Sequence, residues 1–167
     1  MAETILVAVA WPYGNSRIHV GNITGSHLPA DIFARYHRMK GNRVAMVSGT
    51  DSHGTPVTLA ADAEGVSPLK VYKKYHEGFL DLFQKMGTTY DLFTSTHTKN
   101  HFDVSQDIFL ALDKNGYLYT ESREQWYSPS QGRFLPDRYV EGTCYVCGYE
   151  SARGDQCDNC GSLLDAT

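Results

Sequence analysis

A run of six apolar residues near the N-terminus leads into turn-forming residues and then into a helical pattern. The run, residues 5–10, has the length of a strand and no polar alternation, which favours a strand covered on both faces of a sheet. Pro12 ends it, and apolar residues then recur at helical spacing over residues 19–40. We expect Pro29 to kink this helix near Gly25, because a proline removes a helical hydrogen bond.

The order of strand and then helix is repeated twice more along the chain. Strands are predicted at residues 44–47 and 90–93, and helices over 68–86, after the capping residue Ser67, and over 98–115. A β-α-β-α-β-α order predicts an α/β fold with a parallel sheet and right-handed crossovers. We expect the buried stripes of the last two helices to consist of Val71, Tyr75, Phe79, Leu82, Phe83 and Met86, and of Val104, Ile108, Ala111 and Leu112.

Polar and aromatic residues gather where the first two strands end. Tyr13 and His19 follow the first strand, and Asp51 follows the second. Ligands of open parallel sheets bind outside the carboxyl ends of the strands, so these side chains are expected to share one crevice. Backbone N–H groups at the helix start, with Gly21 allowing close approach, suit a phosphate group.

Simpler interpretations of the same residues stay open. A histidine at a helix start is often only a cap. Asp51 could form an Asx turn or cap the helix that contains Pro56, and Trp11 and Tyr13 could be ordinary core aromatics.

The sequence pattern changes after residue 116, where we place a domain boundary. Short aromatic β segments are expected at 117–119, 126–127 and 133–135. All four cysteines follow, at Cys144, Cys147, Cys157 and Cys160. Two C-x-x-C pairs, each trailed by a glycine (Gly148 and Gly161), predict a structural zinc site over residues 142–163. Two disulfides, in three pairings, are the competing interpretation, which the lack of a secretory signal disfavours.

The composition adds few constraints. The 167 residues carry 15 Lys and Arg against 19 Asp and Glu, a net charge of −4, so no general electrostatic footprint for nucleic acid is present. The N-terminal segment resembles neither a secretory signal nor a membrane span, and we expect a cytoplasmic protein that does not bind membranes.

The turn after the first strand reads His19-Val20-Gly21-Asn22, which resembles the His-x-Gly-His signature of the class I aminoacyl-tRNA synthetases. Within that class the chain is most similar to the methionyl-tRNA synthetases, and asparagine in the fourth position is a familiar variant. The resemblance extends along essentially the whole chain, through Ala10-Trp11-Pro12-Tyr13, Pro29-Ala30-Asp31, Ala34-Arg35-Tyr36, Gly49-Thr50-Asp51-Ser52-His53-Gly54-Thr55-Pro56 and Phe134-Leu135-Pro136-Asp137-Arg138-Tyr139-Val140.

This resemblance implies the first half of a Rossmann-like nucleotide-binding fold at residues 1–116, a catalytic half-domain. Residues 117–167 would then begin a connective insertion with the zinc knuckle. The implied reaction activates methionine with ATP and Mg²⁺ and transfers the methionyl group to tRNA. It implies His19 and Asn22 as catalytic residues, His19, Gly21 and Asn22 as the ATP site, and a methionine site of Ala10, Trp11, Tyr13 and Asp51.

The second signature of the class, Lys-Met-Ser-Lys-Ser, is missing from these residues. We therefore expect part of an enzyme, inactive or weakly active alone. Most of its tRNA contacts would lie outside these residues. A second polypeptide could carry the rest of the enzyme. Two alternatives stay open: a non-synthetase nucleotidyltransferase with a similar turn, and a non-catalytic zinc-bearing module that binds a nucleotide or a partner.

Overall fold

The computed structural model describes residues 2–165 and divides into two compact units between Asn115 and Gly116. The first unit contains a three-stranded sheet, and the second contains two short hairpins and all four cysteines. Each unit is described by itself below.

The sheet of the first unit is parallel, as the alternation of strands and helices predicts. Its strands are β1 (Thr4–Ala8), β2 (Arg43–Thr50) and β3 (Leu92–Ser95), in the spatial order β1-β2-β3. The register pairs Val7 with Met46 and Gly49 with Thr94. β2 is longer than predicted and extends three residues beyond residue 47, so its polar end lies inside the sheet.

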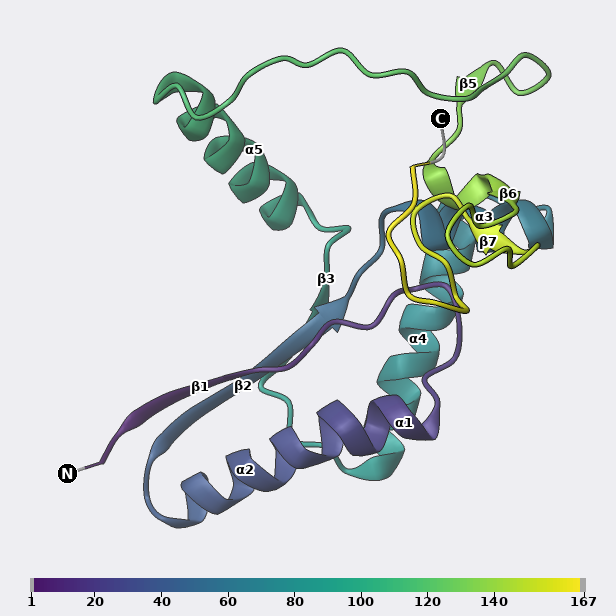
Figure 1. The fold of residues 1–167 in the computed structure, drawn as a ribbon. Helices are drawn as coiled ribbons and strands as arrows, with labels where there is room; N and C mark the ends of the chain where they lie inside the picture. The colour runs from purple at the N-terminus through teal and green to yellow at the C-terminus, as the bar shows by residue number, and fades with distance from the viewer. Residues whose placement is uncertain (1, 166–167) are drawn as a thin grey trace. The chain divides into compact units, whose positions relative to one another are not determined.

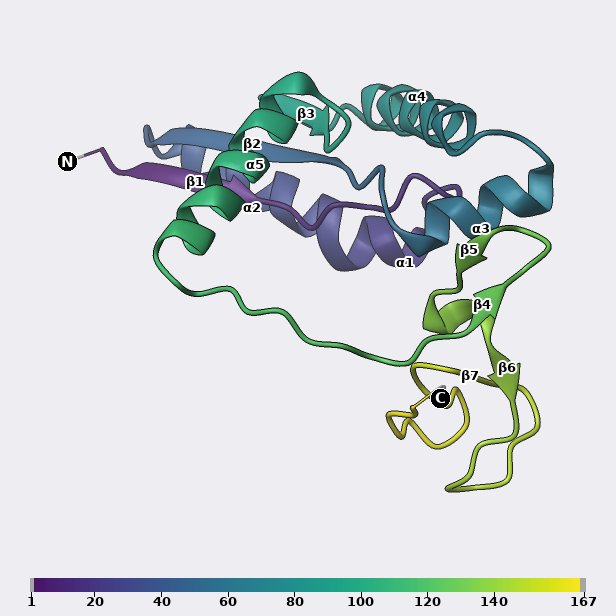
Figure 2. The ribbon, with the colours of Figure 1, turned by 90° about the horizontal axis from the view of Figure 1, so that it is seen from above.

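Helices α2 (Leu28–Met39) and α4 (Pro68–Met86) lie on one face of this sheet, and α5 (Lys99–Lys114) lies on the other (Figure 1). Figure 2, which looks onto the sheet from the α5 side, shows α5 crossing in front of the strands and α2 behind them. Right-handed crossovers that move in one direction along a sheet place their helices on the same face. A further helix, α3 (Thr55–Glu64), packs against α4.

The helix predicted over residues 19–40 is built from three pieces. It begins with α1 (Val20–Asn22), widens into the π-helical turn η1 (Ile23–His27) and continues as α2. Pro29 cannot donate to the carbonyl of Gly25, four residues earlier. The wide turn accommodates this loss, with the N–H of Leu28 donating to the carbonyl of Ile23.

Two clusters of apolar side chains form the core of the first unit. Val9, Ala34 and Met46 are buried between α2 and the sheet. The second cluster joins α3 to α4 through Val57, Ala61, Val71 and Tyr72. Burying apolar area of this kind stabilises the fold by roughly 25 cal/mol for each Å² removed from water.

The predicted burial is wrong on the α5 side of the sheet. Leu6 in β1 is 68% exposed, so β1 is covered on one face rather than on both. The four residues expected to form the buried stripe of α5 (Val104, Ile108, Ala111 and Leu112) are all exposed. The physical reason is that α2 and α4 share the opposite face and that α5 buries no residue against the described chain.

The stripe of α4 is confirmed in part. Val71, Phe79 and Phe83 are buried, and Tyr72 joins them, whereas Met86 at the end of the helix is exposed.

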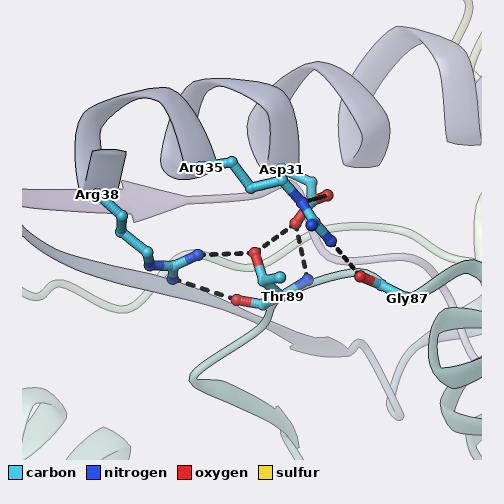
Figure 3. A network of polar contacts seen from close by, with 5 residues as sticks. All are labelled: Asp31, Arg35, Arg38, Gly87 and Thr89. Atoms are coloured by element: carbon cyan, nitrogen blue, oxygen red, sulfur yellow. Dashed lines mark hydrogen bonds and ion pairs between the residues drawn. The ribbon is translucent and has the colours of Figure 1, made fainter. Parts of the chain in front are cut away.

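A buried carboxylate ties α2 to the segment before β3 (Figure 3). One oxygen of Asp31 accepts both the backbone N–H of Thr89, at 2.7 Å, and its hydroxyl, at 2.5 Å. The other oxygen accepts from Nε of Arg35 at 2.7 Å, and Arg35 also donates to the carbonyl of Gly87. Burial alone raises the pKa of Asp31, but the hydrogen bonds from Thr89 and Arg35 outweigh it and hold the pKa below its ordinary value.

The second unit consists of two-residue strands in hairpins. β4 (Tyr127–Ser128) pairs with β5 (Arg133–Phe134), and β6 (Glu141–Gly142) pairs with β7 (Ala152–Arg153), with a 3₁₀ turn at Asp137–Tyr139 between them. The strand expected at residues 117–119 is not formed, and the segment there has no regular structure.

Candidate functional site

The turn after β1 is hydrogen-bonded to the end of β2. The N–H of Asp51 donates to the carbonyl of Pro12 at 2.8 Å, and the N–H of Gly14 donates to the carbonyl of Asp51 at 2.7 Å. Tyr13 and Asp51 thus face each other in a single parallel bridge. This pairing holds the two loops together at the carboxyl ends of the strands, where parallel sheets bind ligands.

His19 and Asn22 cap each other at the start of the helix. The N–H of Asn22 donates to Nδ1 of His19 at 3.4 Å, and the N–H of His19 donates to the amide oxygen of Asn22 at 3.3 Å. Because Nδ1 acts as an acceptor, a neutral His19 carries its proton on Nε2. The capping interpretation is therefore confirmed, and it leaves the Nε2–H of the exposed ring free of this interaction.

The position of Gly21 is explained by the ring of His19. A Cβ at Gly21 would lie 2.9 Å from Cε1 and 3.0 Å from Nδ1 of that ring. Any larger residue at position 21 would therefore push the imidazole out of the capping arrangement.

Trp11, Tyr13, His19 and Asn22 line one cavity of about 260 Å³ in the first unit, whose wall also includes Arg17. Ala10, Gly21 and Asp51, which also belong to the sequence-based site, are not among its lining residues. Arg17 has no place in the sequence-based site, although a basic residue two positions before His19 could have drawn attention to it. A guanidinium and an imidazole that line the same cavity suit an anionic ligand.

The carboxylate of Asp51 makes the local contact that an Asx turn requires. Its Oδ1 accepts from the N–H of His53 at 3.4 Å, and the residue is only half-buried. The interpretation of Asp51 as a helix cap is wrong, because Gly54, with a φ of 97°, occupies the N-cap of α3.

Two histidines meet at the ends of β2 and β3. Nε2 of His53 lies 3.3 Å from Nδ1 of His97, and Phe102 packs against both rings. The side chain of Ser95 accepts from the N–H of His97 and contacts the hydroxyl of Tyr72 at 3.0 Å. Neither histidine belongs to the sequence-based site, although His97 follows the end of β3 by two residues.

A third histidine is buried under the helix start. Nδ1 of His27, in the π-helical turn, lies 2.7 Å from the hydroxyl of Tyr90. Burial lowers the pKa of His27 and raises the pKa of Tyr90 to about 12, so both groups are neutral near pH 7.

In the second unit the four cysteine sulfurs converge, all within 4.8 Å of one another. Sγ of Cys144 lies 3.9 Å from Sγ of Cys160, and Sγ of Cys147 lies 3.6 Å from Sγ of Cys157. A disulfide needs about 2.05 Å, whereas thiolates at about 2.3 Å from a tetrahedral zinc ion lie about 3.8 Å apart. The sulfur spacing therefore fits zinc and does not fit disulfides.

The cysteine pairs are shaped by the glycines that follow them. Gly148 and Gly161 have φ angles of 76° and 72°, which favour glycine, and their N–H groups donate to the carbonyls of Cys144 and Cys157, both at 2.8 Å. Hydrogen bonds from Ser162 lower the pKa of Cys160 to about 6.

Comparisons of the sequence and the fold with known proteins identify relatives of this chain. The family model described as "tRNA synthetases class I (M)" matches residues 5–167. Methionine–tRNA ligase of Thermomicrobium roseum is 59% identical over 99% of the chain, and that of Roseiflexus castenholzii is 60% identical over 99%. Methionyl-tRNA synthetase of Mycobacterium tuberculosis, solved in complex with methionyl-adenylate, superposes with a TM-score of 0.75 and 25% identity over 96% of the chain and 30% of that structure.

The parallel sheet, the His-x-Gly-Asn sequence that follows its first strand and the family match over residues 5–167 together identify a class I tRNA synthetase. The chain belongs to the tRNA synthetase class I (M) family, whose relatives named above are methionine–tRNA ligases. It spans 28% of the length of each of these two relatives. Among the described residues no helix is long and apolar enough to cross a membrane.

Proposed function

We propose that the protein containing this chain activates methionine with ATP, forming methionyl-adenylate and pyrophosphate, and then transfers the methionyl group to tRNA. The observation that carries the proposal is the cavity shared by Trp11, Tyr13, His19 and Asn22 in a chain of this family. Most tRNA contacts would come from parts of the enzyme beyond these residues. The proposed location is the cytoplasm.

In the first step an oxygen of the methionine carboxylate attacks the α-phosphorus of ATP, and the bond to the leaving pyrophosphate breaks. Such a step requires in-line positioning and neutralisation of charge more than covalent chemistry from the protein. The Nε2–H of His19 and the amide of Asn22 would donate to phosphate oxygens, and Gly21 would lie under the adenine. ATP would bring its Mg²⁺ with it as part of the substrate.

The amino acid would bind beside the nucleotide. Trp11 and Tyr13 would contact the methionine side chain, together with the backbone of Ala10. The carboxylate of Asp51 would pair with the ammonium group; the backbone bridge between Asp51 and Tyr13, which holds the two residues side by side, supports this assignment.

Residues 1–116 would form the Rossmann-like catalytic half-domain, and residues 117–167 would begin the connective insertion. Cys144, Cys147, Cys157 and Cys160 would hold a structural zinc ion in a knuckle over residues 142–163. The spacing of their sulfur atoms supports this assignment. With four protein ligands the ion would order the segment and take no part in the reaction.

The proposal is tested by ATP–pyrophosphate exchange with a panel of amino acids, using the 167-residue chain alone and together with a candidate second polypeptide. We expect exchange that depends on methionine, weak or undetectable with the chain alone and restored by the complementing part. Exchange that depends on another carboxylic acid would favour a non-synthetase nucleotidyltransferase. Nucleotide binding without exchange under any of these conditions would favour a non-catalytic binding module.

A further inference from the structure

Gly49 lies in the buried part of β2, opposite Thr94 of β3, and the ring of Trp11 rests on it. A Cβ built at Gly49 would lie 2.6 Å from Cζ3 and 2.7 Å from Cη2 of the indole. Real Cβ atoms essentially never approach closer than 3.0 Å, so the ring occupies the space that any other residue at position 49 would need.

This glycine is required for space and not for backbone conformation. Its φ is not positive, so alanine could adopt the same backbone. Gly78 in α4 offers a contrast, because a Cβ there would meet nothing within 4 Å.

The backbone that carries Trp11 is held to the same strand. The hydroxyl of Ser48, next to Gly49, lies 3.3 Å from the carbonyl of Val9 and 3.4 Å from the carbonyl of Ala10, the residue before Trp11. A ring displaced from Gly49 must therefore turn about its own side-chain bonds, since its backbone is fixed. Because the ring lines the cavity with Tyr13 and His19, its displacement changes the wall of that cavity.

We propose that Gly49 is a positioning residue that sets the size of the methionine pocket by seating the Trp11 indole against β2. The assignment of the pocket to methionine rests on the proposed function, whereas the contact between Gly49 and Trp11 does not. Gly49 touches no substrate and acts only through the ring.

The contact between Gly49 and the Trp11 ring is tested first, in the chain itself and without substrate. Trp11 and Trp126 are the two tryptophans of the chain, so a Trp126→Phe background leaves Trp11 as the only indole. In this background Gly49→Ala should shift the emission maximum of Trp11 and change its quenching by acrylamide by at least twofold. Gly78→Ala, the matched control, should leave both unchanged. An unchanged emission and quenching in Gly49→Ala, with circular dichroism of a folded protein, would overturn the proposal.

A double-mutant cycle separates the ring from the backbone as the source of strain. A Cβ at Gly49 would also lie 2.8 Å from the carbonyl oxygen of Thr94. If the indole is the main obstacle, Gly49→Ala should lower the urea midpoint of unfolding in the Trp11 protein, and by less than half as much in a Trp11→Leu background. An equal loss in both backgrounds would assign the strain to Thr94 and overturn the proposal. If Gly49→Ala fails to fold in the Trp11 protein but folds in the Trp11→Leu background, that rescue supports the proposed contact between Gly49 and the indole.

The pocket is tested in whichever preparation shows methionine-dependent exchange. Gly49→Ala should raise KM for methionine at least fivefold while KM for ATP changes less than twofold, and Gly78→Ala should change neither. An equal effect on both substrates would overturn the role in the methionine pocket. If the wild-type protein shows no such exchange, the proposed function fails, and the emission and the cycle still decide whether Gly49 seats Trp11.

Discussion

Asp31 and Thr89 are 58 positions apart in the sequence, and a single oxygen of the Asp31 carboxylate accepts two hydrogen bonds from Thr89. Asp31 is 6% exposed, so its carboxylate depends on donors from the protein rather than from water. The contact fixes α2 to the segment that leads into β3, and both elements support strands that end at the candidate site.

Asp31→Asn should destabilise the protein by about 2 kcal/mol, because the amide N–H₂ must face a donor of Thr89 or of Arg35 and leaves it unpaired. Urea unfolding followed by circular dichroism measures this loss. Asp81→Asn is the matched control: Asp81 pairs with Lys85 at 2.7 Å with both side chains mostly exposed, and its loss should cost less than about 0.5 kcal/mol. Equal losses in the two variants would contradict the structural role of Asp31.

His27 should make stability depend on pH. Burial lowers its pKa in the folded protein, so below the ordinary value of 6.5 the unfolded chain binds a proton that the folded chain does not. Stability therefore rises with pH through this window. His27→Gln should flatten the dependence of the urea midpoint on pH between about pH 5 and pH 7, whereas His101→Gln should not. Parallel profiles for wild type and His27→Gln would contradict this expectation.

Removal of zinc should unfold the knuckle and spare the sheet. The segment over residues 142–163 buries Cys144, Ala152 and Cys157 as its only core cluster among the described residues, too little to order it without a metal. We expect one zinc ion per chain by elemental analysis and, with a chelator, loss of amide protection in the second unit only. Readdition of zinc should restore it.

Two outcomes would count against a structural zinc site. One is a stoichiometry near zero in protein purified under reducing conditions without chelator. The other is an equal loss of protection in both units, which would indicate a single cooperative structure.

His19 can be tested separately as a cap and as a donor. In a preparation active in exchange, His19→Ala should slow adenylation by raising its activation free energy by about 2.7–4 kcal/mol, the range for loss of a comparable donor. His19→Asn should slow it as well but keep the helix cap, because asparagine is a good N-cap residue. His101→Ala serves as the control, and unchanged rates in both His19 variants would remove His19 from the site.

The three strands of the parallel sheet and the cysteine cluster could be predicted because local patterns determine them. The apolar run at residues 5–10, the turn at Pro12 and the spacing of Cys144 to Cys160 depend on neighbours in sequence. The exposure of Val104 and Ile108 could not be predicted, since an amphipathic stripe does not reveal whether anything packs on it. The contact between His53 and His97 could not be predicted from the sequence either, because it depends on how the segments that follow β2 and β3 meet in the fold.

The reciprocal cap of His19 and Asn22 has a consequence for the speed and strength of ligand capture. A surface imidazole ordinarily samples several rotamers, and fixing such a side chain on binding costs of order 0.5–1.5 kcal/mol. Here Nδ1 is already engaged by the N–H of Asn22, so the ring loses that freedom when the chain folds. At the proposed ATP site, an arriving phosphate group would meet an N–H that is already oriented, and His19 would need no rearrangement before binding.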